Sequence, residues 1–413
     1  MKKLALLLLT FVALGSAVFS ADVAVNGKLT TWAGMETNAT DADSDASDSV
    51  GYLYVNGELN TKVELADNVT VVMELELHDK VSNGASMSNP GNNDTVTIDE
   101  AYVSIGEFFM SNLTLKIGHQ WIENSLRSNH RAMVIASDFT AFKGTFKFES
   151  GALDVIYGKA SESLLSVNTS SDSDLIGLHV AWDFNENIHV IGYVDVATFD
   201  NAGADHGNAI TIGAGIDYFL LDKALELYLE IAGQFGDVNE DVSRSALALD
   251  LGARWTFKEL GSIKGLYVEL NLGYRSGQDD DTDVTKFWNS WAGNTGALLA
   301  ESDYNRSSTN SENPMYQGYA DDSVMAIRLE AGADWTEKIG SHLLLGMFTG
   351  TDESNGVGTT EDAYGVEVDL CTVYKHSENV NFIAHIAAFM PDDGLAVDGD
   401  TIFALAFETT VSF

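Results

Sequence analysis

The side chains that most often carry catalysis or bind metals are scattered over this chain. Its nine histidines are His78, His119, His130, His179, His189, His206, His342, His376 and His385. Nucleophilic catalysis needs a serine or cysteine beside a histidine base and an acid, and no nucleophile motif follows any of these histidines. Cys371 is the single cysteine, which excludes an intrachain disulfide and disfavours a thiolate metal centre. We therefore expect no enzymatic activity, no cofactor and no metal site.

Charged residues follow a more regular spacing, because many of them alternate with apolar residues. Lys116, for example, lies between Leu115 and Ile117. Residues two apart share a face of a β-strand, so this alternation predicts strands with lipid on one face and an aqueous lumen on the other. The basic residues on the lumen parity are Lys28, Lys62, Lys116, Lys143, Lys147, Arg254, Arg275, Arg328 and Lys375. Two interpretations stay open: ion pairs that solvate a wide barrel, or a charged path that selects ions.

The elements that would position these side chains can be read from the same alternation, which continues without a linker-like break. The predicted strands cover residues 22–34, 50–64, 68–80, 95–107, 112–121, 138–149, 151–161, 174–184, 187–199, 208–220, 224–236, 243–258, 264–276, 321–336, 339–350, 362–375, 379–390 and 400–413. Short turns alternate with long connections rich in Asp, Ser, Asn and Gly, as in transmembrane barrels with short periplasmic turns and long outer loops. We predict an all-β antiparallel transmembrane barrel of about 18 strands; 16 strands stay possible.

The two ends of the chain predict export and membrane insertion. Lys2 and Lys3 precede an apolar run from Leu4 to Val18, so residues 1–20 resemble a secretory signal peptide, with an N-terminal membrane anchor as the alternative. Residues 21–413 would then form a single outer-membrane barrel domain. Phe413, Val411 and Phe407 share one face of the last strand, and the terminal Phe resembles the signal read by the barrel-assembly machinery.

The composition disfavours nucleic-acid binding and limits how the chain can cross a membrane. The chain carries 62 acidic and 22 basic residues, a net charge of −40 that disfavours nucleic acid as a partner. Beyond the leader, no stretch approaches the ~18 uncharged apolar residues of a membrane helix. A membrane can then be crossed only by closed β-structure, whose backbone is satisfied internally. Trp32, Trp121, Trp182, Trp255 and Trp335 fall near predicted strand ends, which predicts interfacial aromatic girdles.

Several motifs follow one another between about residues 110 and 395. They are Leu115-Lys116-Ile117-Gly118-His119-Gln120, Asp138-Phe139-Thr140-Ala141-Phe142-Lys143-Gly144, the segment 227–236, Tyr274-Arg275-Ser276-Gly277-Gln278-Asp279, Tyr364-Gly365-Val366-Glu367-Val368-Asp369-Leu370 and Phe389-Met390-Pro391. In this order they resemble the alginate-export family of outer-membrane barrels. The resemblance implies an eighteen-stranded barrel that passes a polyanionic polysaccharide through an arginine-lined pore. The chain departs from the family at Gly118-His119-Gln120, where Gly-Arg-Gln is usual, and at Phe142-Lys143-Gly144, where Phe-Asp-Gly is usual.

These observations favour an outer-membrane channel for passive diffusion or export of hydrophilic solutes, with oligosaccharides or anionic polysaccharide as the expected cargo. Arg127, His130 and Arg131 make the loop 122–137 the most basic patch and a candidate constriction, and the loop 277–320 is a candidate lid. The alternative is a surface structural or adhesion barrel with a plugged lumen. Outer-membrane lipid is the partner in both cases.

Overall fold

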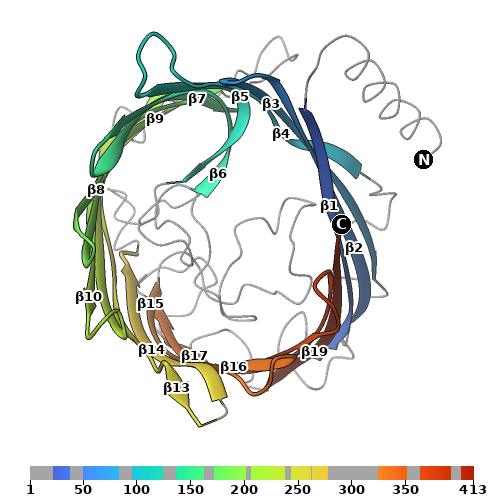
Figure 1. Cartoon of the computed structure of the whole chain (residues 1–413). Coiled ribbons are helices and arrows are strands. Elements are labelled where there is room, and N and C mark those ends of the chain that lie inside the picture. The colour runs from blue at the N-terminus through green and yellow to red at the C-terminus, as the bar shows by residue number, and fades with distance from the viewer. Residues whose placement is uncertain are drawn as a thin grey trace.

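A computed structural model shows a ring of antiparallel strands that closes on itself (Figure 1). The structure describes residues 22–37, 50–82, 95–123, 136–161, 172–200, 206–237, 243–261, 263–277, 324–350, 363–391 and 401–413. All described strands belong to one sheet in which sequence neighbours pair. The predicted signal peptide, residues 1–20, lies outside the described residues.

Eighteen strands build the wall, and the two-residue β13 extends one turn. The strands are β1 (Asp22–Glu36), β2 (Val50–Ala66), β3 (Val69–Ser82), β4 (Thr95–Ile105), β5 (Leu113–Glu123), β6 (Ala136–Phe148), β7 (Gly151–Ser161), β8 (Asp172–Asn185), β9 (Ile188–Asp200), β10 (His206–Leu220), β11 (Leu225–Asp237), β12 (Ser243–Thr256), β13 (Glu259–Leu260), β14 (Ile263–Arg275), β15 (Val324–Asp334), β16 (Ile339–Gly350), β17 (Ala363–Lys375), β18 (Val380–Pro391) and β19 (Ile402–Ser412). Each predicted segment corresponds to one wall strand, so the predicted fold class is confirmed.

The ring closes where the first strand pairs with the last. β1 and β19 are antiparallel, with Lys28 opposite Ser412. Gly27 and Phe413 exchange two backbone hydrogen bonds of 2.9 Å. A Cβ on Gly27 would lie 2.5 Å from the Phe413 ring, so the terminal ring packs directly on this glycine. The terminal residue therefore contributes both backbone and side chain to the closure.

The two faces of the wall differ as the alternation predicts. On β11, Leu227, Leu229 and Ile231 are exposed on the outer face, whereas Tyr228 and Glu230 are buried on the inner face. This exposed apolar surface suits contact with lipid chains. Among the described residues, no helix is long and apolar enough to cross a membrane.

The tryptophans follow the girdle prediction only in part. Trp182, Trp255 and Trp335 are exposed on the outer face close to turns. Trp32 contradicts the prediction, because its side chain is buried on the inner face and stacks on His385 with ring centroids 4.7 Å apart. His385 Nε2 lies 3.2 Å from Glu408 Oε2. A position near a strand end does not determine which face of the wall a tryptophan occupies. Trp32 lies two residues after Thr30, so both side chains are on the inner face.

Candidate functional site at the inner wall

The hairpin of β5 and β6 leaves the wall near its loop end. The pairing of β4 with β5 stops at Ala101 opposite His119, and the pairing of β6 with β7 stops at Thr140 opposite Lys159. Beyond these positions the two strands pair only with each other, over residues 120–123 and 136–139. Figure 1 shows this end of the hairpin, beside the label β6, curving into the interior of the ring. We call residues 120–123 and 136–139 the hairpin tip.

Gly118 supplies the backbone conformation at the point where β5 departs. Its φ is +131°, a value that side-chain-bearing residues rarely adopt. A Cβ at this position would lie 2.2 Å from the carbonyl oxygen of Ala101 and 2.7 Å from Cα of Tyr102. Both obstacles belong to the backbone, so they cannot rotate away. A glycine is therefore required here.

Polar side chains replace backbone hydrogen bonds around the departing strand. Gln120 is fully buried, and its Nε2 donates to the carbonyl oxygens of Ala141 at 3.0 Å, Gly118 at 3.3 Å and Lys116 at 3.4 Å. The backbone N–H of Trp121 donates to Glu100 Oε1 at 3.0 Å, where β4 no longer provides a paired residue. The bond from Gln120 Nε2 to Ala141 satisfies a buried donor and a buried acceptor that would otherwise carry a desolvation cost.

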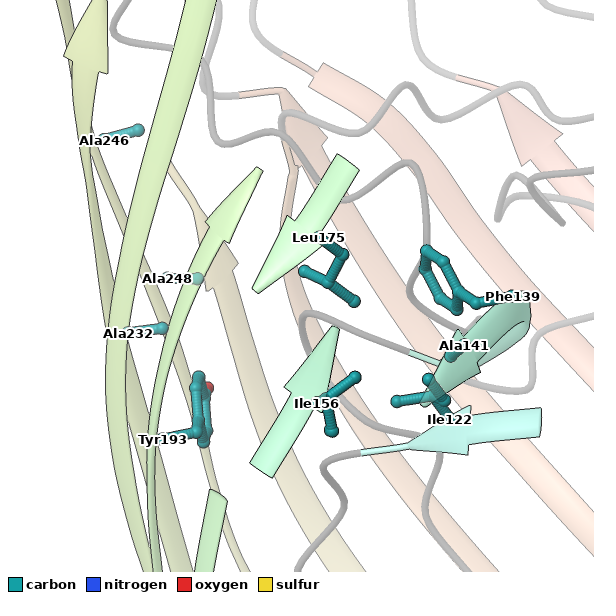
Figure 2. Close-up of a cluster of buried hydrophobic side chains, with 9 residues drawn as sticks. All are labelled: Ile122, Phe139, Ala141, Ile156, Leu175, Tyr193, Ala232, Ala246 and Ala248. Atoms are coloured by element: carbon teal, nitrogen blue, oxygen red, sulfur yellow. The ribbon is translucent and has the colours of Figure 1, made fainter. Parts of the chain in front are cut away.

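An apolar contact holds the hairpin tip against the inner wall. Figure 2 shows Ile122, Phe139 and Ala141 of the hairpin facing Ile156 of β7 and Leu175 of β8, and all five are buried. Burial of a large apolar side chain contributes about 1.5–3 kcal/mol. The expected polar character of the inner face is therefore wrong here, because these inward residues pack on each other instead of facing water. The cluster continues along the inner wall with Tyr193, Ala232, Ala246 and Ala248.

The predicted constriction residues Arg127, His130 and Arg131 lie outside the described residues, in the sequence between β5 and β6. The loop 277–320 also lies outside the described residues, except for Gly277. The structure does describe the hairpin tip, which is the part of β5 and β6 that flanks the loop with Arg127, His130 and Arg131 in the sequence.

Most of the predicted basic residues of β1 to β6 lie beside acidic neighbours. Lys28 Nζ is 3.0 Å from Glu58, and Lys143 Nζ is 2.7 Å from Asp154. Lys116 lies over the Tyr102 ring at 3.7 Å. Its Nζ is also 4.0 Å from Glu100, the same carboxylate that accepts from Trp121. Two further predicted lumen lysines also lie near acids: Lys62 Nζ is 2.8 Å from Glu64, and Lys375 Nζ is 3.6 Å from Asp334. In the strand register, Lys147 is opposite Ala152 and Arg275 is opposite Ala248.

The two remaining arginines lie in a polar network on β11 to β15. Arg254 Nη1 is 3.4 Å from Glu269 Oε2, and its guanidinium stacks 3.9 Å above the Tyr267 ring. Arg328 is buried and donates from Nε to Asn271 Oδ1 at 3.1 Å. Asn271 in turn donates to the Tyr228 hydroxyl at 2.8 Å. Neighbouring strands thus bring these arginines into contact with acids and amides.

Tyrosines opposite glycines are a feature that sequence reasoning missed. Tyr228 is directly opposite Gly252, and a Cβ on that glycine would lie 2.3 Å from the tyrosine hydroxyl oxygen. The ring crosses Gly252, and its hydroxyl donates to Glu269 Oε1 on β14, the next wall strand, at 2.9 Å. Tyr193 repeats this arrangement, because it is opposite Gly213 and its hydroxyl donates to Glu230 on the strand beyond at 2.7 Å. Tyr267 is also opposite a glycine, Gly332, but its hydroxyl donates to Glu330, on the same strand as that glycine.

Acidic residues dominate the inner wall between β9 and β17. Buried inward acids in this sector are Asp195, Asp217, Glu230, Glu269, Glu367 and Asp369, with Asp250 and Glu330 partly buried beside them. Among the described residues of the sector, these acids outnumber the inward basic residues, which are Arg244, Arg254, Arg275, Arg328 and Lys375. The described residues hold no cluster of three or more His, Cys, Asp or Glu arranged to bind a metal.

Comparison with known proteins locates this architecture among solved structures. The chain resembles OccK3 (OpdO) of Pseudomonas aeruginosa with a TM-score of 0.59 and 11% identity, covering 95% of this chain and 96% of that one. It resembles the outer membrane protein OprD from Pseudomonas aeruginosa with a TM-score of 0.57, 13% identity and coverage of 95% and 94%. The chain has the fold of a porin-like outer-membrane barrel.

A third structure, OccAB2 of Acinetobacter baumannii, has a TM-score of 0.58 at 11% identity, covering 94% of this chain and 98% of that one. No protein-family model matches this porin-like chain. No curated protein matches it either. The resemblance to the alginate-export family therefore stays a prediction, and the shared fold is the finding.

Proposed function

We propose that this chain is an outer-membrane channel through which hydrophilic solutes pass down their concentration gradient, without chemical conversion. The observation that carries the proposal is the inward-bent hairpin inside a closed ring of eighteen wall strands. A closed barrel whose outer face is apolar can cross lipid. A hairpin that bends inside it narrows the space through which solutes move, and charged side chains there set selectivity.

The location follows from the same proposal. Residues 1–20 direct export across the inner membrane, and the barrel-assembly machinery recognises the last strand with Phe407, Val411 and Phe413. Phe407 of β19 and Phe413, directly after that strand, are exposed, so a partner or lipid can reach them. The apolar outer face then contacts outer-membrane lipid.

The constriction is proposed to combine the hairpin tip with the loop that it carries, so that Arg127, His130 and Arg131 lie where the lumen is narrowest. The basic residues predicted on the lumen parity would line the path together with the acids of β9 to β17. Because acids dominate that sector, we propose oligosaccharides rather than anionic polysaccharide as cargo, with a weak preference for cations among small ions.

A second function is favoured by one observation. Gln234, Glu367 and Phe389 lie on the inner face and are fully buried, as expected for a barrel whose lumen is filled. A surface structural or adhesion barrel would need no open path. The two functions differ in whether ions cross the protein.

Purified protein in planar lipid bilayers distinguishes them. A channel should give discrete conductance steps. In a salt gradient across the bilayer, the sign of the reversal potential should show that cations permeate more readily than anions. A folded barrel that inserts without conductance would overturn the channel and support the structural role. Folding is checked independently by the strand-rich circular dichroism spectrum.

A further inference from the structure

The hairpin tip has a second face, turned away from the wall, which carries Trp121 and Glu123. Residues two apart share a strand face, so these side chains lie opposite the face of Gln120 and Ile122, which is buried. The Trp121 side chain is 41% exposed. Ile122, on the opposite strand face, packs on Ile156 and Leu175 of the inner wall (Figure 2), so Trp121 is turned away from the wall and is not part of a lipid-facing girdle. The girdle prediction is wrong for this residue.

Hydrogen bonds fix Trp121 at both its backbone and its indole ring. The backbone N–H donates to Glu100 Oε1 at 3.0 Å, and the ring Nε1–H donates to Glu123 Oε2 at 3.3 Å. The packed face beneath, with Ile122 and Phe139, holds the strand that carries Trp121. A flat aromatic surface with a carboxylate at its edge is therefore held in a set orientation, without an ordering cost at the moment of binding.

We propose that Trp121 and Glu123 form a sugar-binding subsite, in which a pyranose ring stacks on the indole and a ring hydroxyl donates to the Glu123 carboxylate. One face of a pyranose is lined by C–H groups and its rim by hydroxyls. The subsite matches both, because the indole offers an apolar plane and the carboxylate accepts hydrogen bonds. This assignment rests on the proposed channel function and names the solute class that the channel selects.

An organic cation is the competing ligand, because an indole face and a carboxylate also attract positive charge. Sites for such cations surround the charge with several rings. The described part of the hairpin tip presents Trp121 as its exposed ring, since Phe139 is buried against the wall. A single ring with one acceptor at its edge suits the flat face of a sugar better than it suits a charged sphere.

Interruption of the ion current by an added solute tests the subsite in planar bilayers. The probe is a linear glucose hexasaccharide, and tetraethylammonium is the cationic counterpart. The wild-type channel is blocked by the hexasaccharide, and Trp121→Ala weakens that block by about tenfold, the loss expected for one aromatic contact. Trp121→Phe restores part of the block because it restores a ring, and Glu123→Gln weakens block less than Trp121→Ala does because an amide still accepts a hydrogen bond.

Trp255→Ala is the matched control, because Trp255 is also 41% exposed but lies on the lipid-facing side. It leaves the block unchanged. In vesicles of brominated lipid, Trp255→Phe removes quenched fluorescence, whereas Trp121→Phe removes fluorescence that lipid does not quench. Lipid quenching of Trp121 would overturn the assignment.

The outcomes separate the subsite from the channel function. Conductance steps without hexasaccharide block, or block that Trp121→Ala does not weaken, would overturn the sugar subsite and leave the channel intact. The wild-type channel could instead be blocked by tetraethylammonium and not by the hexasaccharide, with Trp121→Ala losing the tetraethylammonium block. That result would overturn the sugar subsite and identify an organic cation as the ligand. A silent wild-type barrel would overturn both proposals.

Discussion

The side-chain amide of Gln120 donates to the carbonyl oxygen of Ala141 at 3.0 Å, joining the two strands of a hairpin that has left the barrel wall. The same nitrogen also lies within reach of the carbonyls of Gly118 and Lys116. Gln120 is fully buried, so water cannot substitute for it. This buried donor therefore stabilises the bend of β5, together with the Gly118 backbone and the apolar contact of Ile122 and Phe139 with the wall.

Gln120→Glu removes this donor and places a carboxylate among carbonyl oxygens. Because a buried acceptor left without a donor costs about 1–3 kcal/mol, the free energy of unfolding should fall by about that amount or more. Urea unfolding in lipid vesicles, followed by tryptophan fluorescence, measures it. Asn68→Asp is the control, since Asn68 also donates to a carbonyl, that of Gly106, but is exposed. Equal losses for the two variants would contradict the role of Gln120.

Gly118→Ala should destabilise the barrel, because its φ of +131° and the nearby Ala101 carbonyl leave no room for a Cβ. Strain of this kind costs of order 1–3 kcal/mol. Gly273→Ala is the control, since a Cβ on Gly273 would meet no atom within 4 Å. The same unfolding experiment compares them. A Gly118→Ala protein as stable as Gly273→Ala would refute the bend described for β5.

Tyr228→Phe should lower the free energy of unfolding by about 1–3 kcal/mol, because it removes the hydroxyl that donates to Glu269 and accepts from Asn271. Tyr218→Phe, at an exposed position on the outer face of β10, should change stability little. Gly252→Ala should cost more than Tyr228→Phe, because its Cβ would also lie 2.5 Å from the Leu270 carbonyl oxygen. Thermal unfolding ranks the three variants, and any other order counts against the tyrosine–glycine arrangement.

Arg254→Glu and Arg328→Glu should shift the reversal potential further toward cation selectivity, since each replaces a positive by a negative charge in an acidic sector of the inner wall. Lys258→Glu makes the same charge change in the exposed turn before β13 and should shift it less. Bilayer recordings in a salt gradient measure all three. An unchanged potential in both arginine variants would show that these residues do not line the path.

Alternation and turn residues were sufficient to predict the wall strands. β7 and β16 have the bounds 151–161 and 339–350 that the alternation predicts. Each follows a tight turn, and the centre of β7 alternates clearly, with Leu153, Val155 and Tyr157 on one parity. Period-two alternation reports the two environments of a barrel strand directly, so the fold could be read from one chain.

The bend of the β5–β6 hairpin could not be predicted in this way. The predicted strand ends at residue 121, and the apolar Ile122 on the polar parity of Gln120 does not show whether the strand stays in the wall or leaves it. Gly118 is one of 37 glycines, and its required φ depends on β4, which lies opposite. The tyrosine–glycine pairs were missed for the same reason, because cross-strand register is a property of the folded sheet.

The central claim is that the β5–β6 hairpin narrows an open barrel. His119 and Thr140 are directly opposite each other, so residues 120–139 can be replaced by an Asn-Gly turn that keeps the wall pairing. Single-channel recording should show conductance steps in the wild type and larger steps in the shortened protein. Equal steps in the two proteins, or a folded wild-type barrel that never conducts, would contradict the claim.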